Sequence, residues 1–332
     1  MPGSPPPVRI GVMGCAAIAR RSVIPAIQSL PLFHLAGVAS RSPEKGREFA
    51  ARFRCPYAGD YADLLERDDV DAVYMPLPTG LHLEWGKRAL LAGKHLLAEK
   101  SLAVSLQEAG TLVRLAREHR LVMMENYMFQ YHAQQEAVRQ LAREHLGLLR
   151  LFRATFCFPP LDPGNFRYDP TLGGGALLDA GGYPLKACQM FIGGSIRVLS
   201  SCLAPGGGEV DLWGGAMLAA DRGSDVLPLQ IAFGFDQFYQ CGMELLGQHG
   251  RLTTSRTFTA GPDVTPCAVL ETPRGKEEIR LPQDNHFIRL LEVFHRRVQQ
   301  CDGETACREI LAQARLQDQV RRLAHPPQES PS

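Results

Sequence analysis

The sequence predicts two domains, an α/β domain with a doubly wound parallel sheet followed by an α+β domain with an open-faced, mostly antiparallel sheet. Its 332 residues exceed what one ordinary core accommodates. Over residues 8–126, short apolar runs alternate with helical patterns, which is typical of a parallel sheet covered on both faces. After a helix near 133–145, strand-like runs follow one another with short turns, which indicates antiparallel pairing.

The first domain is predicted from buried apolar runs separated by helix signals. A helix is expected to begin near Ala16. Ser42-Pro43-Glu44 combines a cap, a first-turn proline and an acid that favours the helix dipole. Ser105 and Glu108 have the spacing of a capping box. The strands are expected at 8–14, 34–40, 71–78, 94–100 and 121–127.

The second domain is predicted to hold most of the remaining chain. Strands are expected at 149–158, 195–203, 210–220, 226–235, 243–256, and near 267–272 and 277–281. Helices are expected at 173–192, 285–300 and 304–324. The predicted division is a disordered lead (1–7), a first domain (8–126), a second domain (127–325) and a tail (326–332). The last helices are candidates for packing back onto the first domain.

Composition excludes several classes of protein. Apolar residues make up 45% and charged residues 21%, and 36 Lys and Arg nearly balance 35 Asp and Glu. This balance gives no electrostatic reason to expect nucleic acid or an anionic membrane as a partner. The apolar runs are too short for a membrane span, and the first residues do not resemble a secretory signal. Nine scattered cysteines without a CxxC pair favour reduced thiols, no metal site and a cytoplasmic location.

A glycine turn follows the first strand. Gly14-Cys15-Ala16-Ala17-Ile18-Ala19 has the Gly-x-Gly-x-x-Gly/Ala frame of a Rossmann dinucleotide loop, with alanine at its second and third small positions. Gly14 is expected to make the tight turn, and Ala19 is small enough for helix–strand contact. Ala16 places a methyl group where the backbone usually approaches the pyrophosphate, but N–H groups at the helix start can still bind the anion. The loop predicts nucleotide binding over plain packing.

The end of the second strand predicts which dinucleotide binds. Ser40 and Arg41 stand where an enzyme for NAD places an acid on the ribose diol. A hydroxyl and a guanidinium suit a 2′-phosphate, which a carboxylate would repel. An ordinary polar strand end is the alternative. The pair therefore favours NADP(H).

Three further segments identify the family. They are Ala98-Glu99-Lys100-Ser101, the run from Gly173 to Pro184 (GGGALLDAGGYP), and Pro76-Leu77-Pro78-Thr79-x-x-His82. With the glycine loop, they resemble the glucose–fructose oxidoreductase/inositol dehydrogenase (Gfo/Idh/MocA) superfamily over almost the whole chain. Residues 123–132 and 156–185 are most similar to its sugar 3-ketoreductases of deoxysugar biosynthesis. That resemblance implies NADPH-dependent reduction of the C3 ketone of a dTDP-linked keto-deoxyhexose, as in antibiotic biosynthesis.

Two residues depart from the superfamily pattern. Ser101 replaces the usual proline, and because a non-proline cis bond costs roughly 2.5–4 kcal/mol, it is open whether the peptide bond before it is cis. Tyr183 replaces the histidine of the inositol dehydrogenase branch, and Lys186 stands where that branch often has an acid. These changes argue against oxidation of a polyol by a histidine base.

The chemistry of ketone reduction selects the catalytic candidates. Hydride transfer builds negative charge on oxygen, so the site needs a cation or a proton donor there. Lys100, at a strand end beside the cofactor crevice, suits this role better than that of a solvated surface lysine. Tyr183 is the second candidate, as proton donor or hydrogen-bond donor, with an aromatic core residue as the alternative. The sequence does not decide which of the two delivers the proton.

Other residues have a functional and a structural interpretation. Asp179 lies one helical turn before Tyr183 and is a candidate to orient the sugar hydroxyls. An acid that stabilises the helix start is the structural alternative. Glu99 is a candidate to position Lys100 or the nicotinamide ribose. A simple ion pair is the structural alternative. Leu77 and His82 are candidates for contact with the cofactor. For His82, a loop histidine that is hydrogen-bonded within the protein is an equally good interpretation. The remaining candidates are Arg167 for a phosphate or an ion pair, Tyr61 for the adenine pocket or the core, and Tyr127, Phe129, Phe156 and Phe158 for the sugar or base pocket or the core.

Two alternative functions stay open. One is another member of the superfamily that acts on a free sugar or a dihydrodiol. The other is a non-catalytic regulator that senses NADP, against which Lys100 and Tyr183 argue. Because an open-faced sheet needs covering, we also expect a homo-oligomer through that face.

Overall fold

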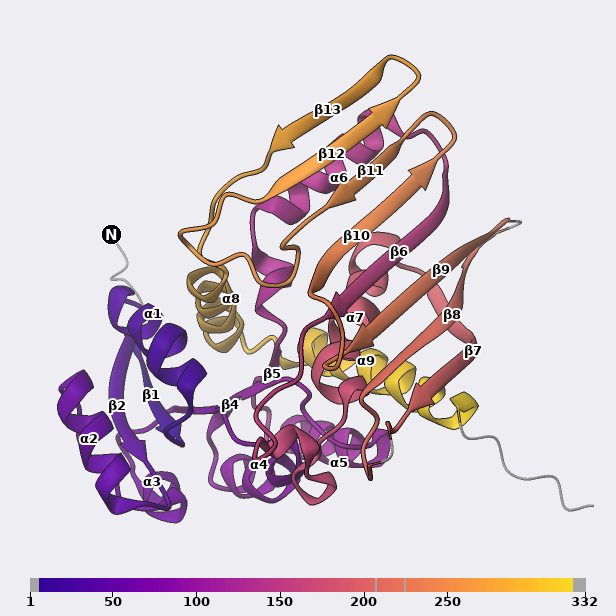
Figure 1. The fold of residues 1–332 in the computed structure, drawn as a ribbon. Helices are drawn as coiled ribbons and strands as arrows, with labels where there is room; N and C mark the ends of the chain where they lie inside the picture. The colour runs from indigo at the N-terminus through magenta and orange to yellow at the C-terminus, as the bar shows by residue number, and fades with distance from the viewer. Residues whose placement is uncertain (1–5, 207, 224, 325–332) are drawn as a thin grey trace, which may run out of the picture. The chain divides into compact units, whose positions relative to one another are not determined.

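The computed structural model describes residues 6–206, 208–223 and 225–324, and these form two compact units (Figure 1). The first unit contains the chain up to Met128 together with Phe287–Ala312, and the second contains Phe129–His286 and the chain from Gln313. The predicted tail and all but the last two residues of the predicted lead lie outside the described residues.

A five-stranded parallel sheet forms the centre of the first unit, as predicted. Its strand order is β2-β1-β3-β4-β5, with every neighbouring pair parallel. The order reverses between β1 and β3, which is the switch point of a doubly wound sheet. The strands are β1 (Val8–Met13), β2 (Phe33–Ala39), β3 (Ala72–Met75), β4 (His95–Glu99) and β5 (Met123–Asn126). The predicted strand at 71–78 ends early because Pro76 and Pro78 cannot donate to a ladder.

Local capping determines where the helices of this unit start. The Oγ of Ser42 accepts from the backbone N–H of Lys45 and caps α2, as its sequence predicts. The Oγ of Ser105 accepts from the N–H of Glu108, but the Glu108 carboxylate accepts from Val104, one residue before the cap. The predicted capping box is thus displaced by one residue. The helices are α1 (Ile24–Ser29), α2 (Pro43–Phe53), α3 (Tyr61–Glu66), α4 (His82–Leu91), α5 (Leu106–Glu118) and, from Phe287 on, α8 (His286–Gln300).

An eight-stranded sheet forms the second unit. Its order is β13-β12-β11-β10-β6-β9-β8-β7, and all neighbours are antiparallel except the pair β6 and β9. The predicted strand at 243–256 is two strands, because the chain turns at 248–250. The strands are β6 (Leu149–Cys157), β7 (Ser195–Ala204), β8 (Trp213–Arg222), β9 (Asp225–Gly234), β10 (Gln240–Gly247), β11 (Arg251–Thr254), β12 (Cys267–Thr272) and β13 (Gly275–Arg280).

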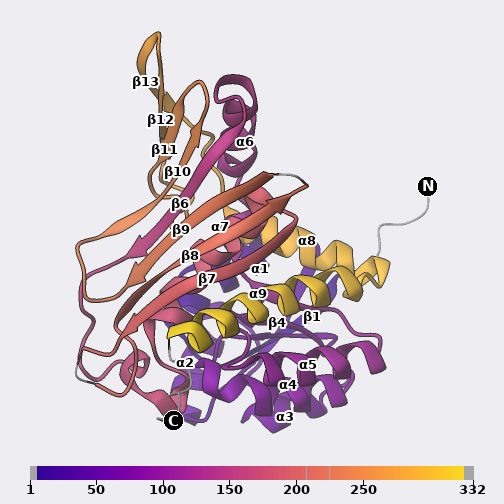
Figure 2. The same ribbon diagram turned by 90° about the vertical axis from the view of Figure 1, so that its right-hand side faces the viewer.

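One face of this sheet is buried and the other is open. On β9 the side chains of Leu227, Leu229, Ile231 and Phe233 are buried, whereas the residues between them are more exposed. This period of two is the mark of a strand with one covered face. The helices α6 (Gln134–His145) and α7 (Gly182–Ile192) lie on the same side of the sheet (Figure 2). The sheet is therefore open-faced, as predicted, and α9 (Gly303–Ala324) is the last helix of the described residues.

No helix within the described residues is long and apolar enough to cross a membrane.

A buried histidine pair in the second unit makes its stability depend on pH. The rings of His132 and His286 meet edge to face at 5.8 Å, and burial, with a smaller effect from His132, lowers the pKa of His286 to about 4. The folded pKa lies below the unfolded value near 6.5. As the pH falls, His286 therefore binds a proton in the unfolded state before it does so in the folded state. The stability that is fully present above pH 6.5 is lost as the pH falls towards 4.

We expect the free energy of unfolding to fall by about 2 kcal/mol between pH 7.5 and pH 5 through His286 alone. Urea unfolding at both pH values measures this difference. His286→Gln removes the titrating group and is expected to flatten the dependence, whatever its effect on stability at pH 7.5. An unchanged difference in the variant would contradict the assignment.

Candidate functional site

The glycine turn after β1 has a conformation that only glycine adopts without strain. Gly14 has a φ of +119°, and a Cβ on it would lie 3.0 Å from a methyl carbon of Leu77 and 3.7 Å from the hydroxyl oxygen of Tyr61. The turn therefore brings Leu77 and Tyr61 next to the predicted loop, although they are distant in sequence. Tyr61 is buried against Trp85, edge to face at 5.0 Å.

The helix after this turn begins at residues 17–18 and continues as a π-helical turn, η1 (Ala19–Val23). The first N–H groups of a helix have no partner within it and form an anion site. The predicted residues Cys15, Ala16, Ala17 and Ile18 lie at this start, and Ala19 is buried. A second π-helical turn, η6 (Leu177–Gly181), contains Asp179. Such turns recur at functional sites, and both fall on segments that the sequence assigns to ligands.

The end of β2 presents a positive group and a buried hydroxyl. Ser40 is buried, and its Oγ accepts from the N–H of Ser42 at 3.2 Å. Arg41 is exposed. Burial raises the pKa of the Tyr61 hydroxyl, and the charge and hydrogen bond of Arg41 lower it, so these two side chains lie together. A guanidinium beside the start of α2 fits a phosphate, as the sequence predicts for NADP(H).

His82 is buried between two loops of the first unit. Its Nδ1 lies 3.1 Å from the carbonyl oxygen of Leu102, and its Nε2 lies 2.8 Å from that of Leu77. Burial lowers the pKa of the ring, which favours the neutral form, and a neutral imidazole donates to only one of the two carbonyls. These contacts agree with the structural interpretation of His82, a loop histidine that is hydrogen-bonded within the protein. Its contact with the cofactor stays a prediction.

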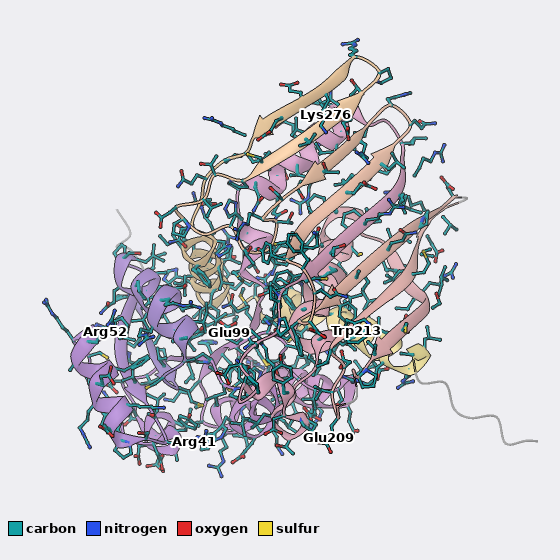
Figure 3. The ribbon with its side chains drawn as sticks, viewed as in Figure 1. Arg41, Arg52, Glu99, Glu209, Trp213 and Lys276 are labelled. Atoms are coloured by element: carbon teal, nitrogen blue, oxygen red, sulfur yellow. The ribbon has the colours of Figure 1, made fainter. Side chains whose placement is uncertain are left out.

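The carboxylate of Glu99, labelled in Figure 3, lies in a polar network at the end of β4. Its Oε1 accepts from the hydroxyl of Tyr74 and from the Nδ2 of Asn126, both at 2.6 Å. Burial raises the pKa of Glu99, while these hydrogen bonds and the charge of Lys100 lower it. Lys100 follows directly, at the carboxyl edge of the sheet where open α/β sheets bind their ligands.

The segment after Lys100 is anchored to β5. The peptide bond between Lys100 and Ser101 is cis, which answers the question raised by the missing proline. The N–H of Leu102 donates to Glu125 at 2.8 Å. The hydroxyls of Ser101 and Tyr127 lie 3.4 Å apart, and both side chains are buried.

In the second unit, Tyr183 lies in an aromatic cluster. Its ring centroid is 5.0 Å from that of Phe156 and 5.7 Å from those of Phe129 and Phe258. Tyr183 is 7% exposed and Phe158 packs on Phe156 at 5.5 Å. The cluster unites three of the predicted aromatic candidates with Tyr183, and it adds Phe258, which the sequence analysis did not single out.

Arg167 and Asp179 form an ion pair in the same unit. The Nε of Arg167 lies 2.7 Å from the Oδ2 of Asp179, and the guanidinium also lies over the ring of Phe166. The ion pair is the alternative that the sequence gave for Arg167. It also places a partly buried carboxylate one helical turn before Tyr183.

Two glycines let the loop before η6 pack closely against other segments of the chain. A Cβ on Gly174 would lie 2.4 Å from the carbonyl oxygen of Arg167, and one on Gly175 would lie 2.4 Å from the Oδ1 of Asp211. The Oδ2 of Asp211 accepts from the N–H of Leu177 at 2.6 Å and caps the helix. The sequence gave no signal for Asp211, because a cap from another segment of the chain has no local pattern.

Two groups of predicted residues thus come together, one in each unit. Among the described residues, no cluster of three or more His, Cys, Asp or Glu could hold a metal ion. The structure places Tyr74, Asn126, Asp211 and Phe258 next to the segments that carry the predicted candidates. Strand pairing, packing or a hydrogen bond brings each of them there from a distant part of the chain, so no local motif could have revealed it.

Comparison with known proteins gives the family. The model of an oxidoreductase family with an NAD-binding Rossmann fold (GFO_IDH_MocA) matches residues 8–127, and that of a GFO/IDH/MocA C-terminal domain matches residues 134–253. A dTDP-3,4-didehydro-2,6-dideoxy-alpha-D-glucose 3-reductase of Streptomyces violaceoruber is 41% identical, with 96% of each chain covered. An NADP-dependent D-xylose 1-dehydrogenase of Haloferax volcanii is 31% identical over 89% of this chain and 90% of its own.

A solved structure is similar over the whole length. The 3-ketoreductase of Actinomadura kijaniata, in complex with NADP and TDP-benzene, has a TM-score of 0.91 and 38% identity, and the alignment covers 96% of this chain and 98% of that one. The family expected from Glu99-Lys100 and the glycine loop is confirmed. The chain belongs to the GFO/IDH/MocA family of oxidoreductases.

Proposed function

We propose that this oxidoreductase uses NADPH to reduce the C3 ketone of a dTDP-linked keto-deoxyhexose, in the synthesis of a deoxysugar for a secondary metabolite such as an antibiotic. The observation that carries the proposal is the likeness, over 96% of the chain, to 3-reductases of such sugars. The exposed Arg41 and the absence of an acid at the end of β2 support NADPH as the cofactor.

Each catalytic candidate has a part in the proposed reaction. When bound, the cofactor would supply the hydride that adds to C3. The oxygen then gains negative charge and needs a proton to become the product hydroxyl. The ammonium of Lys100 stabilises that charge or gives the proton, and the hydroxyl of Tyr183 is the other donor. Asp179, held by Arg167, is available for hydroxyl groups of the sugar.

A substrate panel tests the proposal. Loss of NADPH absorbance is followed with a dTDP-linked 3,4-diketo-2,6-dideoxyhexose, with free glucose and with myo-inositol. We expect turnover of the nucleotide sugar alone. Turnover of the free sugars, with none of the nucleotide sugar, would contradict the proposal.

The similarity to the D-xylose dehydrogenase favours a second candidate function, oxidation of a free sugar with NADP⁺. Adding D-xylose and NADP⁺ to the same panel distinguishes the two. The tyrosine at position 183 favours the first candidate, since it replaces the histidine base expected for polyol oxidation.

We also propose that the chain forms a homo-oligomer through the open face of the eight-stranded sheet. Small residues line part of this face on β7 to β9, where Cys202 pairs with Gly215 and Gly215 pairs with Ala232. On β6 and β10 to β12 it carries linked ion pairs, in which Arg251 bonds both Glu244 and Glu271. A face with both features can match a second copy of itself across a two-fold axis.

Sedimentation tests the oligomer. We expect a dimer or larger assembly at micromolar concentration, and a shift towards monomer in Ala232→Glu, because a buried unpaired carboxylate opposes association. Leu91→Glu, which adds the same charge at an exposed position of α4, is the control and is expected to leave the assembly intact. A monomeric parent protein, or equal effects of both variants, would refute the proposed interface.

A cytoplasmic location also remains a proposal. All nine cysteines are free in the structure, which supports a reducing compartment.

A further inference from the structure

Asn126 ends β5 with only half of its amide group paired. Its side chain is fully buried, and its Nδ2 donates to the Oε1 of Glu99 at 2.6 Å. Its Oδ1 is buried and has no hydrogen-bond partner among the described residues. Buried amide oxygens in folded proteins nearly always have a donor, so this one requires an explanation.

The surrounding network determines which amide atom is unpaired. Glu99 and Asn126 are direct partners across β4 and β5, and Tyr74 reaches the same carboxylate from β3. Turning the amide would set its oxygen against a carboxylate oxygen and leave its two N–H groups facing away. The contact with Glu99 therefore holds the nitrogen towards the carboxylate and leaves the oxygen as a free acceptor.

The position of Asn126 in the sheet indicates which donor it meets. In a doubly wound sheet, the two halves of a dinucleotide lie on either side of the switch point, here between β1 and β3. Arg41 follows β2 on one side, which suits the adenosine half. Glu99 and Asn126 end β4 and β5 on the other side, which suits the nicotinamide half. The donors of that half are the carboxamide N–H and the ribose hydroxyls.

We infer that Asn126 is a cofactor-positioning residue, whose Nδ2 holds the Glu99 carboxylate and whose Oδ1 accepts a hydrogen bond from the nicotinamide half of NADPH. The inference rests on the proposed cofactor. The amide of Asn126 thus links the Glu99 carboxylate, which precedes Lys100, to the nicotinamide half of the bound cofactor. Binding of the cofactor gives a donor to this oxygen, which has none within residues 6–206, 208–223 and 225–324.

Binding measurements test the inference. The dissociation constants of NADPH and of its reduced 3-acetylpyridine analogue, which lacks the carboxamide N–H, are measured by fluorescence for the parent protein and for Asn126→Leu. We expect the substitution to weaken NADPH binding by about 10-fold, the value of one net hydrogen bond. If the donor is the carboxamide, the parent protein prefers NADPH to the analogue and the variant does not. If it is a ribose hydroxyl, the variant loses affinity for both equally.

Tyr74→Phe is the matched control. It removes the other donor to the same oxygen of Glu99 but leaves the Asn126 oxygen in place, so we expect NADPH affinity within about 2-fold of the parent, less than one net hydrogen bond. Thermal melts with and without NADPH show that each variant folds, and we expect a smaller NADPH-induced shift for Asn126→Leu alone. Unchanged affinity in Asn126→Leu, or an equal loss in Tyr74→Phe, would overturn the inference. A parent protein that does not bind NADPH would instead refute the proposed cofactor.

Discussion

Replacing Lys100 with alanine will lower kcat for the keto sugar by about 10²- to 10⁴-fold, the usual contribution of a positioned acid or charge to such a step. The substitution removes the cation expected to meet the developing alkoxide. It leaves in place the hydrogen bonds that hold Glu99, which come from Tyr74 and Asn126. NADPH affinity is therefore expected to change little, and a binding measurement beside the kinetics separates a loss of chemistry from a loss of cofactor.

Two companion variants decide how Lys100 acts. Lys100→Arg keeps the positive charge but cannot give up a proton at neutral pH, and Tyr183→Phe removes the hydroxyl alone. If Lys100 only stabilises charge, the arginine variant recovers most of the rate and Tyr183→Phe loses it. If Lys100 is the proton donor, the arginine variant stays slow and Tyr183→Phe remains active. Full turnover by Lys100→Ala would eliminate both mechanisms.

The sequence predicted most of the fold because its signals are local. The apolar runs, the caps at Ser42 and Ser105 and the glycine at position 14 each depend on a few neighbouring residues. Pro76 shortens β3, the predicted strand at 243–256 is divided by a turn, and the Glu108 carboxylate bonds one residue before the predicted cap. The one parallel pair in the second sheet, β6 with β9, was also beyond local patterns, because strand order depends on contacts between distant segments.

The site was predictable only in part, for the same reason. Lys100, Glu99 and Tyr183 lie in motifs whose spacing carries information. Tyr74 and Asn126 resemble ordinary strand residues, and their roles follow from the order β3-β4-β5. The hydrogen bonds of His82 and the pairing of Arg167 with Asp179 show the structural interpretation of each residue, and their contacts with the cofactor stay predictions.

The cofactor preference offers the second large effect. The 2′-phosphate distinguishes NADPH from NADH, and Arg41 is the exposed cation at the end of β2, beside the hydroxyl of Tyr61. A hydrogen bond to a charged group contributes about 1.5–3 kcal/mol, so Arg41→Ala is expected to lower kcat/KM for NADPH by about 10- to 100-fold. We expect kcat/KM for NADH to stay nearly constant, because NADH has an uncharged ribose diol in place of the 2′-phosphate.

Arg41→Asp should go further and reverse the preference. A carboxylate at this strand end repels the 2′-phosphate and accepts hydrogen bonds from the ribose hydroxyls of NADH. Arg52→Asp, at an exposed position of α2, makes the same change of charge away from the strand end and serves as the control (Figure 3). Comparing kcat/KM for both cofactors in the three variants isolates the contact at position 41 from the general charge of the domain. Equal losses in Arg52→Asp, or an Arg41→Ala enzyme that still prefers NADPH as strongly as the parent, would show that the 2′-phosphate binds elsewhere.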